Sequence, residues 1–421
     1  MLKNSCINPV IVLDSRSEEL LMLRLLFLAL FIIVVWIWLL PIVMPNRERK
    51  AYDDEALRRL AHERGIWGIP QKLSDLSKLY KDANNSLTKE KVQLGRALFF
   101  DENLSSDGSV SCARCHMLSY NSWNKEQFLD DITHPGSKTD CMVCHIQDES
   151  GTDRLATPIG AQGRSDPYHR NTLTVLNASL AKYQLWDGSS KNTLTTIKKM
   201  FHDPYRMNIS QEELLHKVSA NEEYKKQFVM LFDDGVTFYN IQKTLDSYLK
   251  TLVTRSAFDA FLDGNNSAMS EEAKRGFRNF IEIGCNGCHA GRSLGGQTVQ
   301  KFPTRDYNYI INVTSAYDAK YIGRRVGSFE FNFQKHHDFP FENKGGFLGA
   351  KQQRLFRVPN LRNVTKTSPY FHNGAVFNLR EAIYIMAKYQ LSVELTDQQV
   401  DELVAFFKSL EGEVVDYEEL R

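Results

Sequence analysis

A charge excess of either sign is missing from this 421-residue sequence. The 52 Lys and Arg residues nearly balance the 51 Asp and Glu residues, which leaves a formal net charge of +1. Proteins that bind nucleic acid concentrate basic residues on one face, so this balance excludes nucleic acid as an expected partner. Runs with strand character are also scarce. Helical periodicity dominates instead, and we expect a mainly α-helical fold.

Long hydrophobic runs are missing as well, with one exception at residues 25–44, which contains LFLALFIIVVWIWLLPIVM. At about 1.5 Å per residue, a helix of this length matches the roughly 30 Å hydrocarbon core of a bilayer. A cleaved signal peptide is the alternative, but its apolar region usually has about 7 to 15 residues, and no small-residue cleavage site follows Met44. We therefore expect a single-pass anchor at 21–44. A natural-looking start at Met22 would make residues 1–20 a gene-call artefact.

Cysteine is nearly absent outside one repeated pattern. Only Cys6 is unpaired among the seven cysteines, because the other six form three C-x-x-C pairs, each followed directly by His. In such a motif the two thiols form thioethers with a haem, and the adjoining imidazole coordinates its iron. The sequence therefore predicts three covalent haems. Their attachment residues are Cys112, Cys115 and His116; Cys141, Cys144 and His145; and Cys285, Cys288 and His289.

Two other uses of these cysteines are weaker. The spacing of the CARCH and CMVCH pairs is close to that of a zinc ribbon, in which four thiolates surround one ion. A ribbon does not require a His after each pair, and the CNGCH pair would lack a partner. Disulfides between neighbouring cysteines also leave the three histidines unexplained. Haem attachment accounts for all nine residues.

The haem motifs also predict where the chain resides and how it is divided. Bacterial c-type haem is attached outside the cytoplasmic membrane, so we expect an inner-membrane anchor with the body in the periplasm. The length of the body favours two domains. We expect a spacer at 45–88, a first haem domain at 89–255 with an insertion at about 119–152, and a second haem domain at 256–421.

Two helices are predicted around the third motif. The stretch SEEAKRGFRNFIEIGCNGCH at 270–289 is amphipathic and leads directly into the haem motif. Near the C-terminus, Thr396 and Gln399 have the spacing of a capping box, and the apolar pattern that follows ends at Gly412. A small c-type cytochrome domain requires such a pair of helices, one leading into the haem and one packed across it.

Several stretches occur together in one order, namely LGRALFFDENLSSDGSVSCARCH, RNTLTVLN, LWDG, FRVPNLRNVTKTSPYFHNG and EAIYIMAKYQL. They resemble the signatures of the bacterial dihaem cytochrome c peroxidases, a family that also contains enzymes that mature tryptophan cofactors. The resemblance covers about residues 90 to 412. It implies two cytochrome c domains facing one another, with a peroxidatic haem in the first and an electron-transfer haem in the second.

The resemblance assigns roles to individual residues. His116 is the ligand of the peroxidatic haem, Met386 is the sixth ligand of the electron-transfer haem, and Trp186 is an electron bridge between the two. From the residues alone, Met386 and Trp186 also fit as core side chains. The resemblance further implies a calcium site at Asn171, Thr367 and Pro369, where side-chain and backbone oxygens suit a hard cation.

One departure from the family pattern concerns proton transfer. The family places a Glu twenty residues after the LWDG tryptophan, where this chain has Arg206. A guanidinium can stabilise charge on a leaving oxygen, but it does not release its proton near neutral pH. His202 is the best replacement base in the sequence, on the expectation that both residues share a helical face, and a surface role explains it equally well.

A second departure concerns the removable sixth ligand of the peroxidatic haem. The family usually has a His in a loop close to IGH, whereas this chain reads TPIGAQGR and has Ala161 there. Either the iron is permanently open or another group coordinates it. His134 and His169 are the candidate replacements.

We therefore expect a trihaem cytochrome peroxidase that reduces hydrogen peroxide with electrons from a cytochrome, a quinol or a membrane complex. The CMVCH haem, carried by the insertion, is expected to deliver electrons. The alternatives are an electron-transfer subunit with a degenerate peroxidase site and an oxidase that modifies a protein partner. The family often dimerises, so a homodimer is an expected assembly.

Overall fold

The computed structural model describes residues 53–80, 82, 84–118, 151–153, 155–304, 341, 343 and 345–420. The predicted anchor at 21–44, His134 and the CMVCH residues Cys141, Cys144 and His145 lie outside these residues. None of the helices in the described ranges is both long enough and apolar enough to cross a membrane. The chain divides into Met1–Asp54 and Glu55–Arg421, and the description that follows concerns the second unit.

The expected mainly α-helical fold is confirmed. The main helices are α2 (Asp54–Glu63), α3 (Leu73–Tyr80), α4 (Lys89–Phe100), α5 (Cys112–Cys115), α8 (Thr193–His202), α9 (Gln211–Ala220), α10 (Glu222–Leu231), α11 (Phe238–Thr251), α12 (Ala257–Leu262), α13 (Glu271–Glu282), α16 (Leu379–Met386) and α17 (Asp397–Ser409). Two small antiparallel pairs complete the described fold: β1 (Thr254–Ser256) with β4 (Gly412–Val414), and β2 (Val299–Lys301) with β3 (Leu355–Arg357).

Side-chain caps fix where the important helices begin. The predicted capping box is present at α17, where Thr396 accepts a hydrogen bond from the amide of Gln399 and the Gln399 side chain accepts one from the amide of Thr396. At the start of α13, the Ser270 side chain accepts a hydrogen bond from the amide of Ala273. Both helices around the third motif therefore start where their sequences predict.

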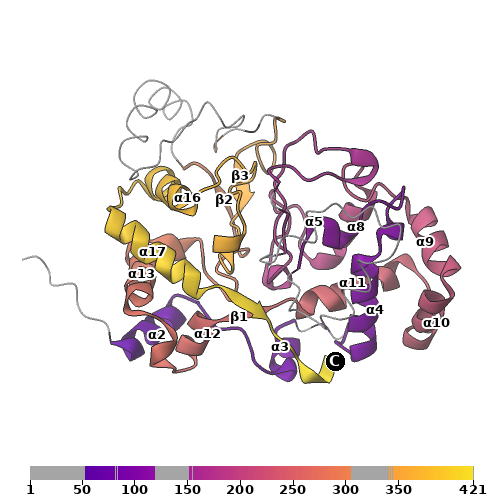
Figure 1. Ribbon diagram of the computed structural model, residues 1–421, viewed down its shortest axis with the longest axis horizontal. Coiled ribbons are helices and arrows are strands. Elements are labelled where there is room, and N and C mark those ends of the chain that lie inside the picture. Colours follow the sequence, from indigo (N-terminus) through magenta and orange to yellow (C-terminus); the bar gives the residue numbers. More distant parts are fainter. Residues whose placement is uncertain are drawn as a thin grey trace, which may run out of the picture. The chain divides into compact units, whose positions relative to one another are not determined.

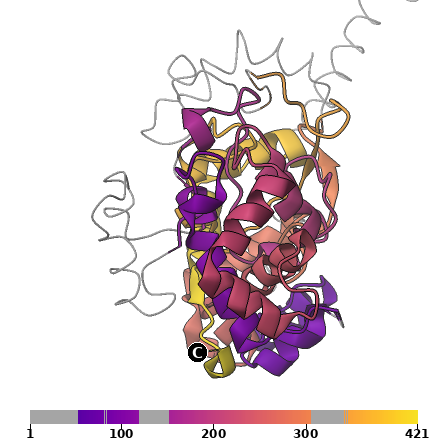
Figure 2. The same cartoon turned by 90° about the vertical axis from the view of Figure 1, so that its right-hand side faces the viewer.

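The first hydrophobic core lies where α4 crosses α11. A Cβ atom on Gly95 of α4 would lie only 2.2 Å from the carbonyl oxygen of Thr244 in α11, so glycine is required for this close approach. Buried Phe99 and Tyr248 meet edge to face at the crossing, with ring centroids 5.3 Å apart. Figure 2 looks onto this side of the molecule, where the helices of residues 193–251 stand in front.

The second hydrophobic core lies where α13 crosses α17, and Figure 1 shows these two helices side by side. Gly276 of α13 allows this contact, because a Cβ atom there would lie 1.7 Å from the carbonyl oxygen of Glu402. Buried aromatic rings fill the space. The ring centroid of Phe406 in α17 lies 5.2 Å from that of Phe277 and 5.3 Å from that of Phe280. This crossing is the helix pair predicted around the third haem motif.

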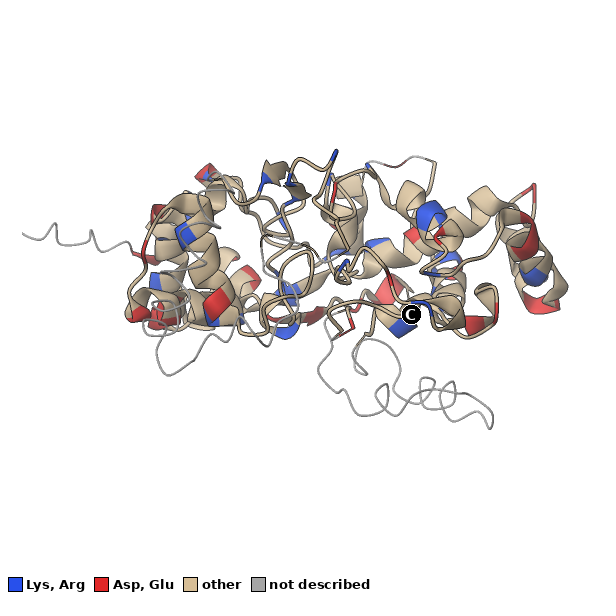
Figure 3. Cartoon of the chain, turned by 90° about the horizontal axis from the view of Figure 1, so that it is seen from above, with Lys and Arg blue, Asp and Glu red and all other residues tan. Residues whose placement is uncertain are grey.

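Acidic and basic side chains are interspersed along the described helices, as the blue and red residues of Figure 3 show. Many pairs lie one helical turn apart at the surface, for example Lys78 with Asp75 at 2.9 Å. Exposed pairs of this kind contribute little to stability. The pair of Arg362 and Asp259 differs, because both side chains are fully buried and their atoms approach to 2.7 Å.

Candidate haem sites

The CARCH and CNGCH motifs fold into the same local turn. In each, the amide of the histidine donates to the carbonyl of the first cysteine at 2.9 Å: His116 to Cys112, and His289 to Cys285. In each, the ring Nδ1 lies within hydrogen-bond distance of a carbonyl, that of Gly151 at 3.2 Å and that of Leu294 at 3.1 Å. Donation from Nδ1 leaves Nε2 as the ring nitrogen available to a metal.

The four cysteines of these motifs, Cys112, Cys115, Cys285 and Cys288, are of intermediate exposure and form no disulfide with one another. Burial raises the pKa of the Cys112 and Cys285 thiols to about 12, so they are neutral at physiological pH. Burial also lowers the pKa of His116 and His289 to about 4, which keeps both imidazoles neutral, as iron ligation requires. Two thiols and one oriented, neutral imidazole in each motif fit a covalent haem.

Met386 packs against the same hydrophobic core as the second motif. It is the last residue of α16, it is partly buried, and both it and Cys285 pack against the second hydrophobic core. The helix continues past Met386 as a π-turn at Ala387–Leu391, a widening that is frequent at functional sites. A thioether in this position fits the predicted sixth ligand, whose role stays a prediction.

Trp186 and His372 link the loops of the two cores. The Trp186 indole nitrogen donates to the carbonyl of Asn171 at 2.8 Å, and the Trp186 carbonyl accepts from the amide of Arg357 at 2.7 Å. Its ring meets that of buried His372 edge to face, with centroids 6.4 Å apart, and His372 in turn stacks on Phe356 at 4.3 Å. Trp186 therefore contacts Asn171, from the region of the first motif, and both Arg357 and His372, from the region of the second motif.

The predicted calcium residues are brought together only in part. Asn171 Nδ2 donates to the carbonyl oxygen of Pro369 at 2.6 Å, while Asn171 Oδ1 is buried and has no hydrogen-bond partner among the described residues. Rotating this amide by half a turn would aim Oδ1 at the same place as the Pro369 carbonyl, and two converging oxygens suit a hard cation. The Thr367 hydroxyl instead donates to the carbonyl of Val364 at 3.0 Å.

Arg206 is held by a buried carboxylate and lies within electrostatic reach of the first motif. Its guanidinium donates to Asp166 Oδ2 at 2.9 Å and to the carbonyl of Tyr205 at 3.0 Å. Burial is the main influence on the pKa of Cys115 and of His116, and the charge of Arg206 acts to lower both values. Arg206 is thus near enough to act electrostatically on this motif.

Ala161 is fully buried at the position of the family's removable ligand, and its loop is tied to Arg206. The Ala161 amide donates to the Arg206 carbonyl at 2.7 Å, and the amide of Gln162 donates to Asp107 at 2.7 Å. A Cβ atom on Gly160 would lie 2.3 Å from the Tyr205 carbonyl, so this loop rests directly on the Tyr205–Arg206 backbone.

The expectation that His202 and Arg206 share a helical face is wrong, because α8 ends at His202 and Arg206 follows in a turn. His202 is exposed, stacks on Phe238 at 5.5 Å, and has its Nδ1 3.0 Å from the carbonyl of Ile209. His169 has a positive φ of 48°, and its carbonyl accepts from Asn343 at 2.9 Å. Catalytic and ligand roles for these histidines stay predictions.

Comparison with known proteins shows the family of this chain. The family model for di-haem cytochrome c peroxidase matches residues 89–137 and 125–267. The cytochrome c551 peroxidase of Nitrosomonas europaea is 30% identical over 330 residues, which cover 77% of this chain and 81% of that protein. This chain belongs to the dihaem cytochrome c peroxidase family. The predicted peroxidase-like oxidoreductase is thereby confirmed, and membership implies covalently bound haem c.

Other members of the family are similar along most of this chain. The cytochrome c551 peroxidase of Pseudomonas aeruginosa is 30% identical over 351 residues, which cover 82% of this chain and 83% of that protein. The methylamine utilization protein MauG of Methylophilus methylotrophus is 27% identical over 355 residues, covering 78% and 84%. The crystal structure of a MauG-like protein associated with microbial copper homeostasis shares the fold, with a TM-score of 0.57, 20% identity and coverage of 81% and 95%.

Two carboxyl groups near these peroxidase-family sites escaped the sequence prediction. Burial raises the pKa of Asp153 to about 6, although Thr172 donates a hydrogen bond to it. Burial raises the pKa of Glu381 to about 7, and its Oε1 has no partner among the described residues. Asp166 was missed too, because no motif surrounds it. The one signal in the sequence was Arg206 in place of the family's Glu, because a buried arginine requires a nearby carboxylate.

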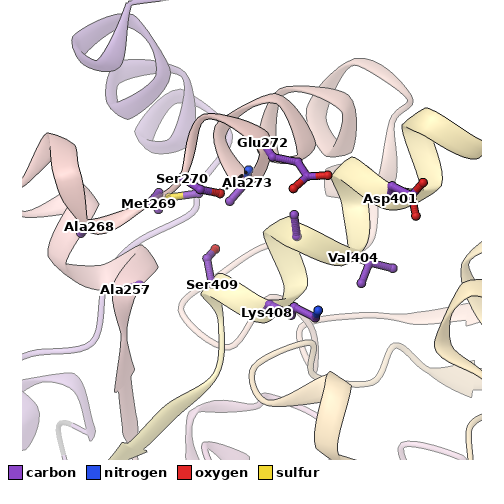
Figure 4. A pocket seen from close by; sticks show the side chains of 11 residues that line it. Ala257, Ala268, Met269, Ser270, Glu272, Ala273, Asp401, Val404, Lys408 and Ser409 are labelled. Atoms are coloured by element: carbon purple, nitrogen blue, oxygen red, sulfur yellow. Dashed lines mark hydrogen bonds between the residues drawn. The ribbon is translucent and has the colours of Figure 1, made fainter.

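A surface groove of about 460 Å³ lies apart from these residues. Figure 4 shows it between the start of α13 and the second half of α17, with Met269 and Ala273 on one side and Val404 and Lys408 on the other. None of the predicted site residues lines it. Within the described ranges, no cluster of three or more His, Cys, Asp or Glu side chains is arranged to hold a metal ion.

Proposed function

We propose that this protein is a membrane-anchored, periplasmic trihaem cytochrome peroxidase. It would reduce one hydrogen peroxide to two waters, consuming two electrons and two protons, with electrons from a cytochrome or quinol donor. When bound, the haems would supply the peroxide-binding iron and the electron relay. The chain's own residues would attach and orient the haems, leave one iron open, and stabilise charge beside it.

The difference between the two described motifs carries this proposal. Met386 ends α16 and packs against the same core as Cys285, which supports its thioether as the closing ligand of the second motif. At the first, the loop position of the family's removable ligand is Ala161, whose methyl group cannot coordinate iron. One closed and one open iron are what a peroxidase with a separate electron-transfer haem needs.

Arg206 supplies the electrostatic part of the reaction in this proposal. Breaking the O–O bond places negative charge on the leaving oxygen, and a guanidinium that is already fixed in position stabilises that charge without reorganising. Trp186 would link the sites, since it touches Asn171 through its indole nitrogen and His372 through its ring. The protons would come through a route that does not use Arg206, because its guanidinium stays charged.

The CMVCH haem is proposed to be an entry port for electrons at the first site. The amide of Gly151 donates to the carbonyl of Met117 at 2.7 Å, so the segment between them leaves and re-enters the fold at one place. That place adjoins His116, whose ring also contacts the Gly151 carbonyl. Because both ends of the segment lie beside the first motif, we propose that its haem passes electrons to that motif. Intact mass of the mature protein should show three covalent haems, whereas two would remove this part of the proposal.

Calcium is proposed at the junction of the two regions, near Asn171 and Pro369. Its support is the buried Oδ1 of Asn171, which has no partner among the described residues, on the same amide whose Nδ2 lies 2.6 Å from the Pro369 carbonyl. Because Asn171 also accepts from Trp186 and donates its amide to the His372 carbonyl at 2.8 Å, a cation here would stiffen the bridge between the sites. Chelation with EGTA should slow peroxide turnover, and added calcium should restore it.

Turnover of peroxide with a reduced donor tests the proposed function. We expect the wild-type protein to consume peroxide. The Arg206→Glu variant exchanges the fixed cation for the family's proton-carrying residue, and a change in its rate shows which of the two groups the reaction depends on. Binding of CO to the reduced wild-type protein should show an open iron. Activity that neither exists in the wild type nor arises in Arg206→Glu would contradict the peroxidase proposal.

The other candidate, an electron-transfer subunit, is favoured by one observation, the replacement of the family's Glu by Arg206. It predicts rapid haem oxidation and reduction without peroxide turnover and without CO binding. An oxidase of a protein partner would instead show an open iron with no turnover. Peroxide turnover and CO binding, measured together, therefore distinguish the peroxidase, the electron-transfer subunit and the oxidase of a protein partner.

A further inference from the structure

A line of four alternating charges runs outward from Arg206. Its guanidinium lies 2.9 Å from Asp166 Oδ2, the same oxygen lies 2.8 Å from Arg170 Nε, and Arg170 lies 3.4 Å from Asp203. The Asp166 side chain is fully buried, whereas those of Arg206, Asp203 and Arg170 are 15%, 18% and 26% exposed. A buried carboxylate persists only when it is paired, so this line is a fixed part of the fold.

Asp166 is itself held rigidly. Its Oδ1 accepts from the amide of Tyr168 at 2.9 Å, and its carbonyl accepts from the amide of His169 at 3.0 Å. Its two guanidinium partners keep its pKa below the usual value despite burial, so it stays charged. The carboxylate therefore offers Arg206 a partner that neither moves nor becomes neutral.

Arg206 is fixed from its backbone side as well. Its carbonyl accepts from Ala161 at 2.7 Å, and its amide donates to the carbonyl of Asp203 at 3.0 Å. The Ala161 loop is tied to Asp107 through the amide of Gln162, and Asp107 belongs to the stretch that leads into the CARCH motif. The backbone of Arg206 is therefore fixed by these hydrogen bonds, and its guanidinium is fixed by Asp166.

We propose that Asp166 is a positioning residue that fixes Arg206 as a permanent cation within electrostatic reach of the CARCH motif. The fixed cation makes this site favour small anionic ligands over neutral ones. This inference rests on the proposed assignment of CARCH as the open site. It deepens that assignment by naming the ligand class, because a cation that need not reorganise interacts most strongly with an anion or with an oxygen that gains charge.

Ligand binding to the oxidised full-length holoprotein tests the inference without turnover. Azide is the anionic probe and imidazole is the neutral probe, and both are followed in the haem absorption spectrum. We expect Asp166→Asn to raise the Kd of azide on the order of tenfold, because Arg206 loses its buried partner. The Kd of imidazole should change less than about twofold, since no charge is gained on binding it.

Asp203→Asn is the matched control. It makes the same change at the far end of the line of charges, where the carboxylate pairs with Arg170 and not with the Arg206 guanidinium. Its amide oxygen can still accept the hydrogen bond that Tyr205 donates to Asp203 at 2.9 Å. We expect the affinities of both probes to stay at the wild-type level. Asp166→Glu should restore part of the azide affinity, which a loss of structure at this position would not allow.

A double variant separates positioning from general damage. In an Arg206→Gln background the cation is gone, so adding Asp166→Asn should leave azide binding unchanged. Should Asp166→Asn fail to fold, Arg206→Gln alone still tests the preference for anions, because it should weaken azide and spare imidazole. Equal weakening of both probes, an unchanged azide Kd, or no azide binding to the wild type would overturn the inference. Peroxide turnover is not involved, so a failed peroxidase assay leaves this result interpretable.

Discussion

The CARCH and CNGCH motifs differ in their surroundings rather than in their own folding. In both, His116 or His289 is oriented by the same pair of carbonyl contacts. The second motif shares its core with Met386, whereas the first lies beside Ala161 and Arg206. Under the proposed function, C-x-x-C-H specifies attachment, while residues far away in the sequence decide whether the iron is closed or reactive.

The region of the second motif is also hydrogen-bonded to the segment between α2 and α3. The amide of Gly291, just beyond CNGCH, donates to the carbonyl of Gly65 at 3.0 Å, and the amide of Ile69 donates to Asp259 at 2.7 Å. Asp259 is the buried partner of Arg362, which follows Arg357 at the end of β3 by five positions. This reinforcement suits a relay site that keeps one geometry.

The largest effect is expected from breaking that reinforcement. Asp259→Ala leaves the Arg362 guanidinium buried without its carboxylate, which should cost about 3 to 5 kcal/mol in the free energy of unfolding. Denaturant unfolding followed by circular dichroism measures the loss. Asp263→Ala is the control, because its bond to Arg255 involves a carboxylate that is 49% exposed, and it should cost less than about 1 kcal/mol. Equal losses would mean that the buried pair has no special role.

The next effect converts the closed site into an open one. Met386→Ala removes the proposed thioether ligand, so the reduced protein should bind one more CO per chain than the wild type. Met269→Ala is the matched control, because Met269 is a buried methionine of the same core and is 3% exposed. It should cost about 2 to 5 kcal/mol of stability without adding a CO site. An unchanged CO stoichiometry in Met386→Ala would exclude this methionine as a ligand.

The reverse change should close the open site. Ala161→His restores the family's imidazole, and the oxidised protein should shift from a high-spin to a low-spin spectrum and bind azide at least about tenfold more weakly. Gln162→His, on the exposed neighbouring residue, should leave the spectrum unchanged. If the spectrum of Ala161→His matches that of the wild type, another group already occupies the first iron.

The smallest effect concerns Glu381 and pH. Burial raises its pKa from 4.5 to about 7, so the folded protein holds an extra proton between these values and its stability falls as the pH rises through that window. Because the side chain is only partly buried, Glu381→Gln should add about 1 kcal/mol of stability at pH 8 and almost none at pH 4.5. Denaturation midpoints at both pH values measure it, and an equal gain at each would rule out the protonation of Glu381 as the cause.

Much of this site follows from the sequence. The attachment residues, the helix leading into CNGCH and the capping box at Thr396 are local patterns, and local patterns determine turns and helices directly. The fixation of Arg206 could not be predicted, because Asp166 lies forty positions away and only the tertiary fold brings the two together. The same reason explains the wrong expectation for His202, since the end of α8 is set by the turn that follows it.

Near-infrared magnetic circular dichroism of the oxidised full-length protein tests the central claim most directly, because it distinguishes methionine-ligated low-spin haem from open high-spin haem in one spectrum. We predict both signatures together, with the methionine signature absent from Met386→Ala and the high-spin signature absent from Ala161→His. A wild-type spectrum that contains only bis-histidine low-spin haem would contradict the account.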